Sequence, residues 1–129
     1  MNSDSSPLVV LLVDDAEDCI ATLDVALQAL PRVVVRSAAT AEAAMGLLTR
    51  ETISAVITDL QLPGMNGLDL IASIRKQEKF RTLPIVAVSA AADPSAPRAA
   101  LQSGADAFFS KPFSPSAIRK RLEELLHAS

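Results

Sequence analysis

The sequence predicts a single doubly wound α/β domain, in which five parallel strands form one sheet and five helices cover its two faces. Three observations lead to this fold class. Short apolar runs alternate with segments of helical periodicity five times along the chain. The first run, Leu8–Val13, is apolar throughout, which is typical of a strand covered on both faces of a parallel sheet. A chain of 129 residues, 50% of them hydrophobic, can bury one core but not two.

The first half of the chain contains two strand–helix units. After the first strand, leucine and isoleucine residues recur at helical spacing until Pro31 ends the segment. Three consecutive valines then favour a second strand, and Thr40 is a suitable N-cap for the helix that follows. The predicted elements are a strand over 8–13, a helix over 16–30, a strand over 32–37 and a helix over 40–50.

The second half of the chain contains three more units. The proline and glycine residues of segment 63–67 predict a sharp loop after the third strand. Pro97 is acceptable only in the first turn of its helix, and Ser114-Pro115 opens the last helix. The predicted elements are strands over 54–59, 84–89 and 105–109, and helices over 68–79, 96–103 and from 114 onward. Right-handed crossovers between such units place helices on both faces of the sheet.

Reactive side chains gather at the predicted carboxyl ends of the strands, where an open parallel sheet has its ligand crevice. Asp14 and Asp15 follow the first strand, and Asp59 ends the third. Ser89 ends the fourth strand, and Lys111 follows the fifth. Three converging carboxylates repel one another unless a cation offsets their charge, and carboxylate oxygens are preferred ligands of Mg²⁺. We therefore expect a divalent metal at this edge.

Each of these residues also has an ordinary explanation when it is taken alone. An aspartate after a strand commonly caps a helix or forms a turn. Lys111 alone would be a solvated surface lysine, and Ser89 alone would be a loop hydroxyl. The functional prediction therefore depends on all five residues lying at one edge of the same sheet.

Five fragments, in this order and spacing, resemble the receiver domains of bacterial response regulators in two-component systems, with the chemotaxis regulators as the nearest type. The resemblance covers roughly residues 8–126 and implies the flavodoxin-like receiver fold. The fragments are Val13-Asp14-Asp15, Thr58-Asp59-Leu60-Gln61-Leu62-Pro63-Gly64-Met65-Asn66-Gly67, Val88-Ser89-Ala90, Gly104-Ala105-Asp106 and Lys111-Pro112-Phe113.

The resemblance implies a set of roles for the acidic residues. Asp59 would be the phosphoacceptor, attacking the phosphorus of a phosphohistidine to leave an acyl phosphate. Asp15 and Asp59 would bind Mg²⁺ directly, Gln61 would add its backbone carbonyl, and Asp14 would help through water. The sequence departs mildly from the family at Asn66, where aspartate is common, and we expect no consequence for metal binding.

The resemblance also implies how the phosphoryl group would be stabilised and sensed. Lys111 would neutralise charge on it, and Ser89 would donate a hydrogen bond to one of its oxygens. The movement of Ser89 would let Phe108 turn inward, although a plain core phenylalanine is an equally good interpretation of Phe108. The Lys111-Pro112 peptide bond is expected to be cis.

The family further implies the partners. We expect a histidine kinase or histidine phosphotransfer protein as donor, and a downstream effector domain or protein that responds to the face formed by the fourth helix, fifth strand and fifth helix. The chain would catalyse only its own phosphorylation and dephosphorylation, so it is not expected to be an enzyme in the usual sense. The net charge of -3 and pI near 5.0 speak against direct nucleic-acid binding.

Composition gives the remaining expectations. No apolar run approaches the length needed to span a bilayer, and the start of the chain is polar, so we expect a cytoplasmic location without membrane insertion. Residues 1–7 are expected to be a flexible tail and residues 8–127 the receiver domain. The one cysteine, Cys19, is expected to be a small buried or half-buried hydrophobe. His127 is expected at a solvated helix end.

Three other functions compete with this interpretation. A phosphatase with an aspartate nucleophile would normally have a second acid two residues on, where this chain has Gln61. A flavin or nucleotide binder of similar topology would need a glycine-rich phosphate loop after the first strand. A docking module that has lost phosphorylation would not need the full acidic set.

Overall fold

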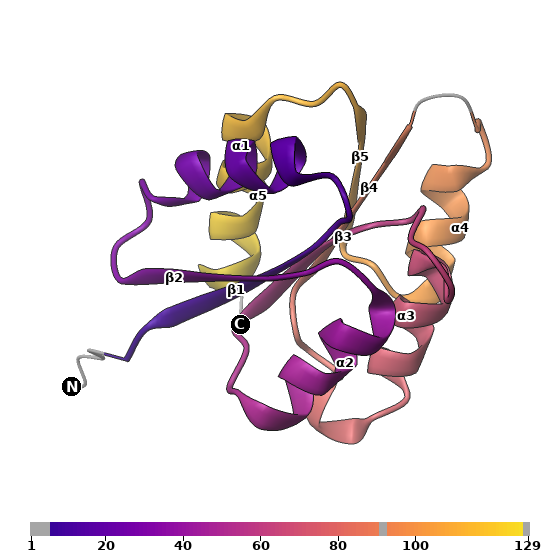
Figure 1. Cartoon of the computed structure of the whole chain (residues 1–129), viewed down its shortest axis with the longest axis horizontal. Helices are drawn as coiled ribbons and strands as arrows, with labels where there is room; N and C mark the ends of the chain where they lie inside the picture. Colours follow the sequence, from indigo (N-terminus) through magenta and orange to yellow (C-terminus); the bar gives the residue numbers. More distant parts are fainter. Residues whose placement is uncertain (1–5, 91–92, 128–129) are drawn as a thin grey trace.

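A five-stranded parallel sheet with the strand order β2-β1-β3-β4-β5 forms the centre of the computed structural model, which describes residues 6–90 and 93–127 (Figure 1). The predicted fold class is therefore confirmed. The strands are β1 (Leu8–Val13), β2 (Val33–Ala38), β3 (Ala55–Asp59), β4 (Ile85–Ala90) and β5 (Ala107–Lys111). In this order the winding of the chain switches direction between β1 and β3, which is the place where such sheets bind ligands.

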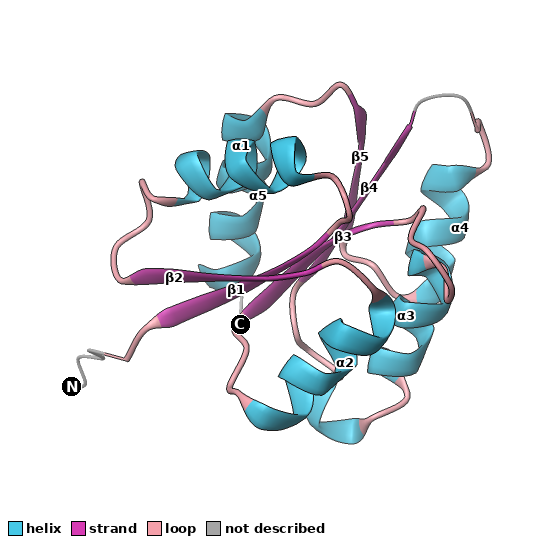
Figure 2. Ribbon diagram, in the orientation of Figure 1, coloured by secondary structure: helices cyan, strands magenta, loops and turns pink. Residues whose placement is uncertain are grey.

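Five helices cover the two faces of the sheet (Figure 2). One face carries α1 (Glu17–Leu27) and α5 (Pro115–His127). The other face carries α2 (Ala41–Arg50), α3 (Gly67–Arg75) and α4 (Ala96–Ser103), with a short 3₁₀ helix, η1 (Glu78–Phe80), after α3. No helix in the described part of the chain is both long and apolar enough to cross a membrane.

The buried side chains form one core on each face of the sheet. In β1, Leu11 and Val13 belong to the core under α2, α3 and α4, whereas Val10 and Leu12 belong to the core under α1 and α5. These four side chains are at most 1% exposed. Burying each contributes roughly 1.5–3 kcal/mol, which explains why β1 is apolar at every position.

Side chains that cap helices fix where two of them begin. The Thr40 hydroxyl accepts a hydrogen bond from the Ala43 N–H at 3.1 Å, so the predicted cap of α2 is confirmed. Asn66 does the same for α3, where its side-chain oxygen accepts from the Asp69 N–H at 2.8 Å. The predicted first-turn position of Pro97 and the cis Lys111-Pro112 bond are also confirmed.

Some predicted boundaries are wrong. The third helix ends at Arg75, not at Lys79, because the backbone turns to an extended conformation at Gln77 (φ -88°, ψ 126°) and then forms η1. The Arg75 guanidinium donates to the carbonyls of Phe80 and Gly104 beside this turn. The fifth strand spans 107–111 instead of 105–109, so Lys111 is its last residue and does not follow it.

The late start of β5 has a physical reason. The Asp106 carboxylate accepts the Ile85 N–H at 2.9 Å and an Arg75 N–H at 3.0 Å, so Asp106 forms a turn ahead of the strand. The first helix is also shorter than predicted, spanning 17–27. Of the predicted N-terminal tail, residues 1–5 lie outside the described residues.

Candidate functional site

Three carboxylates meet at the carboxyl ends of β1 and β3. These strands are neighbours in the sheet, with Val13 opposite Thr58, and in each strand the next residue is an aspartate, Asp14 or Asp59. One oxygen from each of Asp14, Asp15 and Asp59 lies within 4.8 Å of the other two. Asp14 and Asp59 are 6% exposed, whereas Asp15 is open to solvent. Two buried acids beside an exposed third form a site of concentrated negative charge.

Backbone N–H groups orient the two buried carboxylates. The Asp14 Oδ1 atom accepts the Ala16 N–H at 2.8 Å, and the Asp59 Oδ1 atom accepts the Gln61 N–H at 3.0 Å. In both cases the donor is two residues further along, which is the geometry of an Asx turn. The second oxygen of each carboxylate is thereby directed into the site. The contact that Gln61 makes here is through its N–H group.

The Lys111 ammonium closes the site from β5. Its Nζ atom lies 2.9 Å from Asp59 Oδ2 and 3.3 Å from Asp14 Oδ2. Burial by itself would lower the pKa of Lys111, but the hydrogen bond and charge of Asp59, together with the charge of Asp14, outweigh it and raise the pKa. Lys111 therefore remains a cation that offsets part of the acidic charge.

Ser89 and Phe108 lie on the two neighbouring strands β4 and β5. Ser89 is 4% exposed and follows Val88, which pairs with Asp59 across β3 and β4. Phe108 pairs with Ala87 and is half-buried, packing against the core under α2, α3 and α4. Its ring also lines a small hollow of about 120 Å³ with Pro94 and Pro97. Ser89 and Lys111 therefore lie near the carboxyl ends of their strands, as the three aspartates do, whereas Phe108 lies near the middle of the sheet.

Sequence reasoning missed two features of this end. Gly67 begins α3 so close to β3 that an added Cβ would overlap the Asp59 carbonyl oxygen and lie 2.6 Å from Leu60 Cα. Cys19 is half-buried on α1 as expected, but it also faces the acidic group: burial, then a hydrogen bond to Asp14, raises the pKa of its thiol to about 12. Neither feature has a local sequence signal.

The donor set of the site suits a hard divalent cation. Carboxylate oxygens at the edge of a sheet are the ligands that Mg²⁺ prefers, and one of the three acids is open to solvent, where metal-bound water can remain. Asp14, Asp15 and Asp59 are the residues that could hold such an ion. The nearby Cys19 thiol is a soft ligand, which a hard cation such as Mg²⁺ does not prefer.

Comparison with known proteins places this geometry in a family. The family model for the response regulator receiver domain matches residues 10–123. The chain belongs to the response regulator receiver family. Receivers of this family bind Mg²⁺ in an acidic site and act as signalling domains with histidine kinases and effectors as partners.

Among relatives of this receiver, a chemotaxis protein CheY homolog of Campylobacter jejuni is 34% identical over 84 residues. That match covers 64% of the receiver chain and 65% of the relative, just under two thirds of its length. The sensory/regulatory protein RpfC of Xanthomonas campestris is 39% identical over 87 residues, which cover 66% of this chain and 12% of RpfC.

Solved structures show the same fold. A crystal structure of a candidate response regulator from Chloroflexus aurantiacus has a TM-score of 0.88 at 32% identity, covering 95% of this receiver and 99% of that chain. The receiver domain of a Pseudomonas aeruginosa sensor histidine kinase, described with a magnesium ion coordinated in its active-site cleft, has a TM-score of 0.83 at 26% identity, covering 95% and 99%.

Proposed function

We propose that this receiver accepts a phosphoryl group on Asp59, with Mg²⁺, from the phosphohistidine of a histidine kinase or histidine phosphotransfer protein. One observation carries the proposal. Oxygens of Asp14, Asp15 and Asp59 converge within 4.8 Å, and the Lys111 ammonium lies 2.9 Å from Asp59. A nucleophilic carboxylate, a place for a divalent cation and a fixed positive charge are the groups that phosphoryl transfer requires.

The metal ligands in this proposal are Asp15 and Asp59 directly, Asp14 through water, and the backbone carbonyl of Gln61. The relative from Pseudomonas aeruginosa, with its magnesium ion in the active-site cleft, supports a cation at this position. Bound there, Mg²⁺ would draw negative charge from the phosphoryl oxygens in the transition state. Because Asp14 and Asp59 are buried, the electrostatic stabilisation by a cation would be larger here than in water.

The chain's own residues perform the transfer. One Asp59 oxygen forms the bond to phosphorus while the bond from phosphorus to the imidazole nitrogen breaks, and the imidazole keeps that electron pair. The Gln61 N–H group holds Asp59 Oδ1, which limits the carboxylate to one orientation. Lys111 neutralises charge on the side of Asp59 Oδ2. Ser89 would donate its hydroxyl hydrogen to a phosphoryl oxygen once the acyl phosphate has formed.

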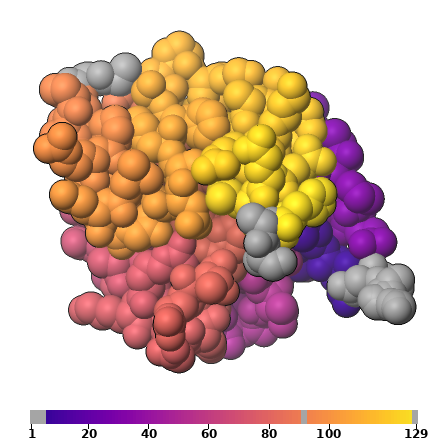
Figure 3. Space-filling view, turned by 180° about the vertical axis from the view of Figure 1, so that it is seen from behind, coloured from indigo at the N-terminus to yellow at the C-terminus, as the bar shows by residue number. Residues whose placement is uncertain are grey.

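The acyl phosphate would be sensed through β4 and β5. Phosphorylation replaces one carboxylate charge with about two negative charges and three strong acceptors, which would pull Ser89 and Lys111 inward. Phe108, three residues before Lys111 on β5, would then turn inward and change the α4-β5-α5 face. Figure 3 shows that face, where the orange and yellow parts of the chain form one continuous surface for an effector domain or protein.

This function makes the domain a switch that acts on itself, with no turnover of an external substrate. Gln61 occupies the position where an aspartate-dependent phosphatase would normally carry its second acid. Its amide side chain cannot donate a proton to a leaving group as a carboxylic acid can. Turnover of a phosphoester in excess over the protein would favour the phosphatase instead.

Beryllofluoride, a phosphoryl analogue, tests the proposal by NMR. With Mg²⁺ present it should shift the amide resonances of Gln61, Ser89 and Lys111 and those of α4 and β5, and EDTA should reverse the shifts. Asp59→Asn should abolish the response, whereas Asp69→Asn, an exposed acid in the first turn of α3, should keep it. Shifts confined to Asp15 and its neighbours would indicate metal binding without phosphoryl acceptance and would contradict the proposal.

A further inference from the structure

A groove crosses the molecule at the end of the sheet opposite to Asp59. It consists of two hollows, of about 540 Å³ and about 480 Å³, at the amino ends of the strands. The first opens between the end of α2 and the segment before β4, and the second between the starts of β1 and β2 and the end of α5. Thr52 and Ser54 line both hollows, so the two lie next to each other, and we call them together the basal groove.

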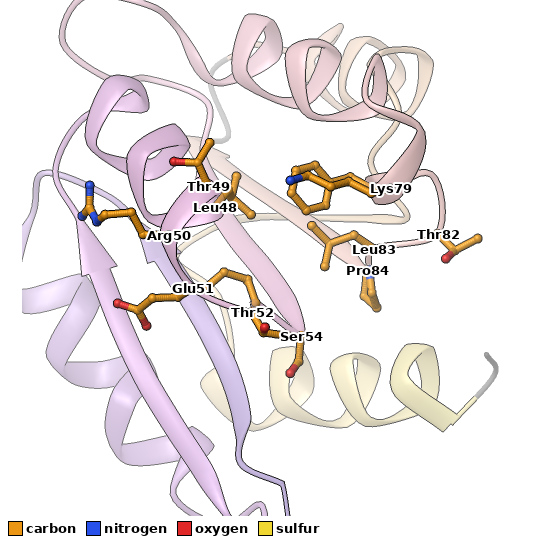
Figure 4. Close-up of a pocket in the computed structure, with 12 residues that line it drawn as sticks. Leu48, Thr49, Arg50, Glu51, Thr52, Ser54, Lys79, Thr82, Leu83 and Pro84 are labelled. Atoms are coloured by element: carbon orange, nitrogen blue, oxygen red, sulfur yellow. The ribbon is translucent and has the colours of Figure 1, made fainter.

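The first hollow combines an apolar base with one cation (Figure 4). Leu48 and Leu83 lie on opposite sides of it, and the Lys79 side chain points across it toward Leu48. The Lys79 Nζ atom lies 5.0 Å from the centroid of the Phe80 ring, a cation–π distance that favours this direction. The charged side chains of Arg50 and Glu51 point away from the hollow.

The second hollow has the same combination. Leu8, Leu30 and Pro31 supply apolar surface, and Arg32 supplies a cation. Arg32 has a φ of 60°, the left-handed region that residues with a Cβ atom disfavour and that glycine or asparagine normally fills.

The charge balance of the basal groove is positive. No carboxylate in the described ranges 6–90 and 93–127 forms an ion pair with Arg32 or Lys79. The acids along the groove are already neutralised, because Glu51 pairs with Arg36 at 3.0 Å and Glu123 pairs with Arg119 at 2.8 Å. The groove therefore presents apolar surface between two cations, Arg32 and Lys79, that could bind carboxylates of a partner.

We propose that the basal groove docks an extended acidic peptide segment of a partner protein. Arg32 directly precedes β2, and Lys79 lies in η1, six residues before β4. The strands β2 and β4 are three positions apart in the sheet, and three spacings of about 4.8 Å make roughly 14 Å, so a segment that reaches both cations needs at least four to five extended residues. The segment would carry two carboxylates four residues apart, with an apolar side chain between them on the same face.

This docking is independent of the proposed phosphoryl transfer. The groove lies at the amino ends of the strands, whereas Asp59 lies at a carboxyl end. A partner held in the groove would leave the acidic site open to a phosphodonor. The groove would thus give the receiver a constitutive contact that does not depend on the state of Asp59.

Binding of the synthetic heptapeptide Ser-Glu-Leu-Leu-Leu-Glu-Ser, followed by amide NMR and fluorescence anisotropy on the full chain, tests the proposal. The amide shifts should map to the groove, and the same peptide with glutamine in place of glutamate should bind at least roughly tenfold more weakly. Affinity should fall as salt rises. Equal affinity for the two peptides, or shifts that map elsewhere, would overturn the proposal.

Matched variants locate the two cations. Arg32→Gly removes the charge and suits the positive φ, and Lys79→Gln changes an exposed side chain, so both should fold. Each variant should lower the affinity for the glutamate peptide roughly fivefold, whereas Lys120→Gln, at an exposed position on α5, should leave the affinity unchanged. Self-association that either groove variant removes would mean that a second copy of the chain occupies the groove, which would contradict a peptide partner.

Discussion

Replacing Lys111 by methionine would remove the fixed positive charge from the acidic site and keep much of the side-chain volume. In the structure Lys111 Nζ lies 2.9 Å from Asp59 and 3.3 Å from Asp14, and the two carboxylate side chains are 7% and 4% exposed. Without the ammonium, two buried carboxylates and Asp15 would face one another with no offsetting charge. The free energy of unfolding of the metal-free protein should therefore fall.

The size of this loss follows from the geometry. At these distances and an effective dielectric constant of about 20, each charge contact has a Coulomb energy of about 5 kcal/mol. The desolvation of the charged groups offsets much of that energy, and breaking a buried pair typically costs about 3–5 kcal/mol. Because the Lys111 side chain is 30% exposed, we expect a loss of about 2–3 kcal/mol, or roughly 10 °C in Tm.

Urea unfolding with and without Mg²⁺ measures the effect. Magnesium should stabilise Lys111→Met by more than it stabilises the parent chain, because in the variant it offsets carboxylates that have no other cation. Lys120→Met, on the exposed side of α5, serves as the control and should change stability by less than about 0.5 kcal/mol. Equal losses for the two variants, or the same Mg²⁺ response in all three proteins, would refute the electrostatic reasoning.

Three further predictions concern the surroundings of the site. Asn66→Ala removes the cap of α3 and should cost about 1 kcal/mol in urea unfolding, with Asp69→Ala as the less damaging comparison. Gly67→Ala should cost more than the cap, because its Cβ would overlap the backbone of Asp59; retained stability would refute that contact. Because the pKa of Cys19 is raised from 9.0 to about 12, native protein at pH 8 should react with iodoacetamide at least roughly tenfold more slowly than protein unfolded in urea. For the same reason the stability of the fold should decrease as the pH rises from 9 toward 12.

The strands could be predicted because a buried strand consists of consecutive apolar residues, which can be recognised in the sequence. Leu8–Val13 is apolar at every position since helices cover both faces of β1, and the prediction matched that strand to the residue. The convergence of Asp14, Asp15 and Asp59 followed from topology alone, because parallel strands end at one edge. The acidic cluster could therefore be predicted from the sequence, whereas the roles given to its residues remain predictions.

The errors came from contacts between residues far apart in the chain. Arg75 and Asp106 are 31 positions apart, and their hydrogen bond joins the end of α3 to the turn before β5, the two places where these boundaries were predicted wrongly. The periodicity of apolar residues along the sequence does not indicate a contact between side chains so far apart. The closeness of Cys19 to Asp14 and the left-handed φ of Arg32 likewise depend on how helices and connections pack, which the local sequence does not encode.

The chemical identity of the acceptor is best tested by intact mass spectrometry after incubation with acetyl phosphate and Mg²⁺. The parent chain should gain the mass of one phosphoryl group, and the gain should vanish with EDTA and in Asp59→Asn. Asp69→Asn should be labelled like the parent chain. Labelling that persists in Asp59→Asn, or a parent chain that stays unlabelled while it binds Mg²⁺, would contradict the role given to Asp59.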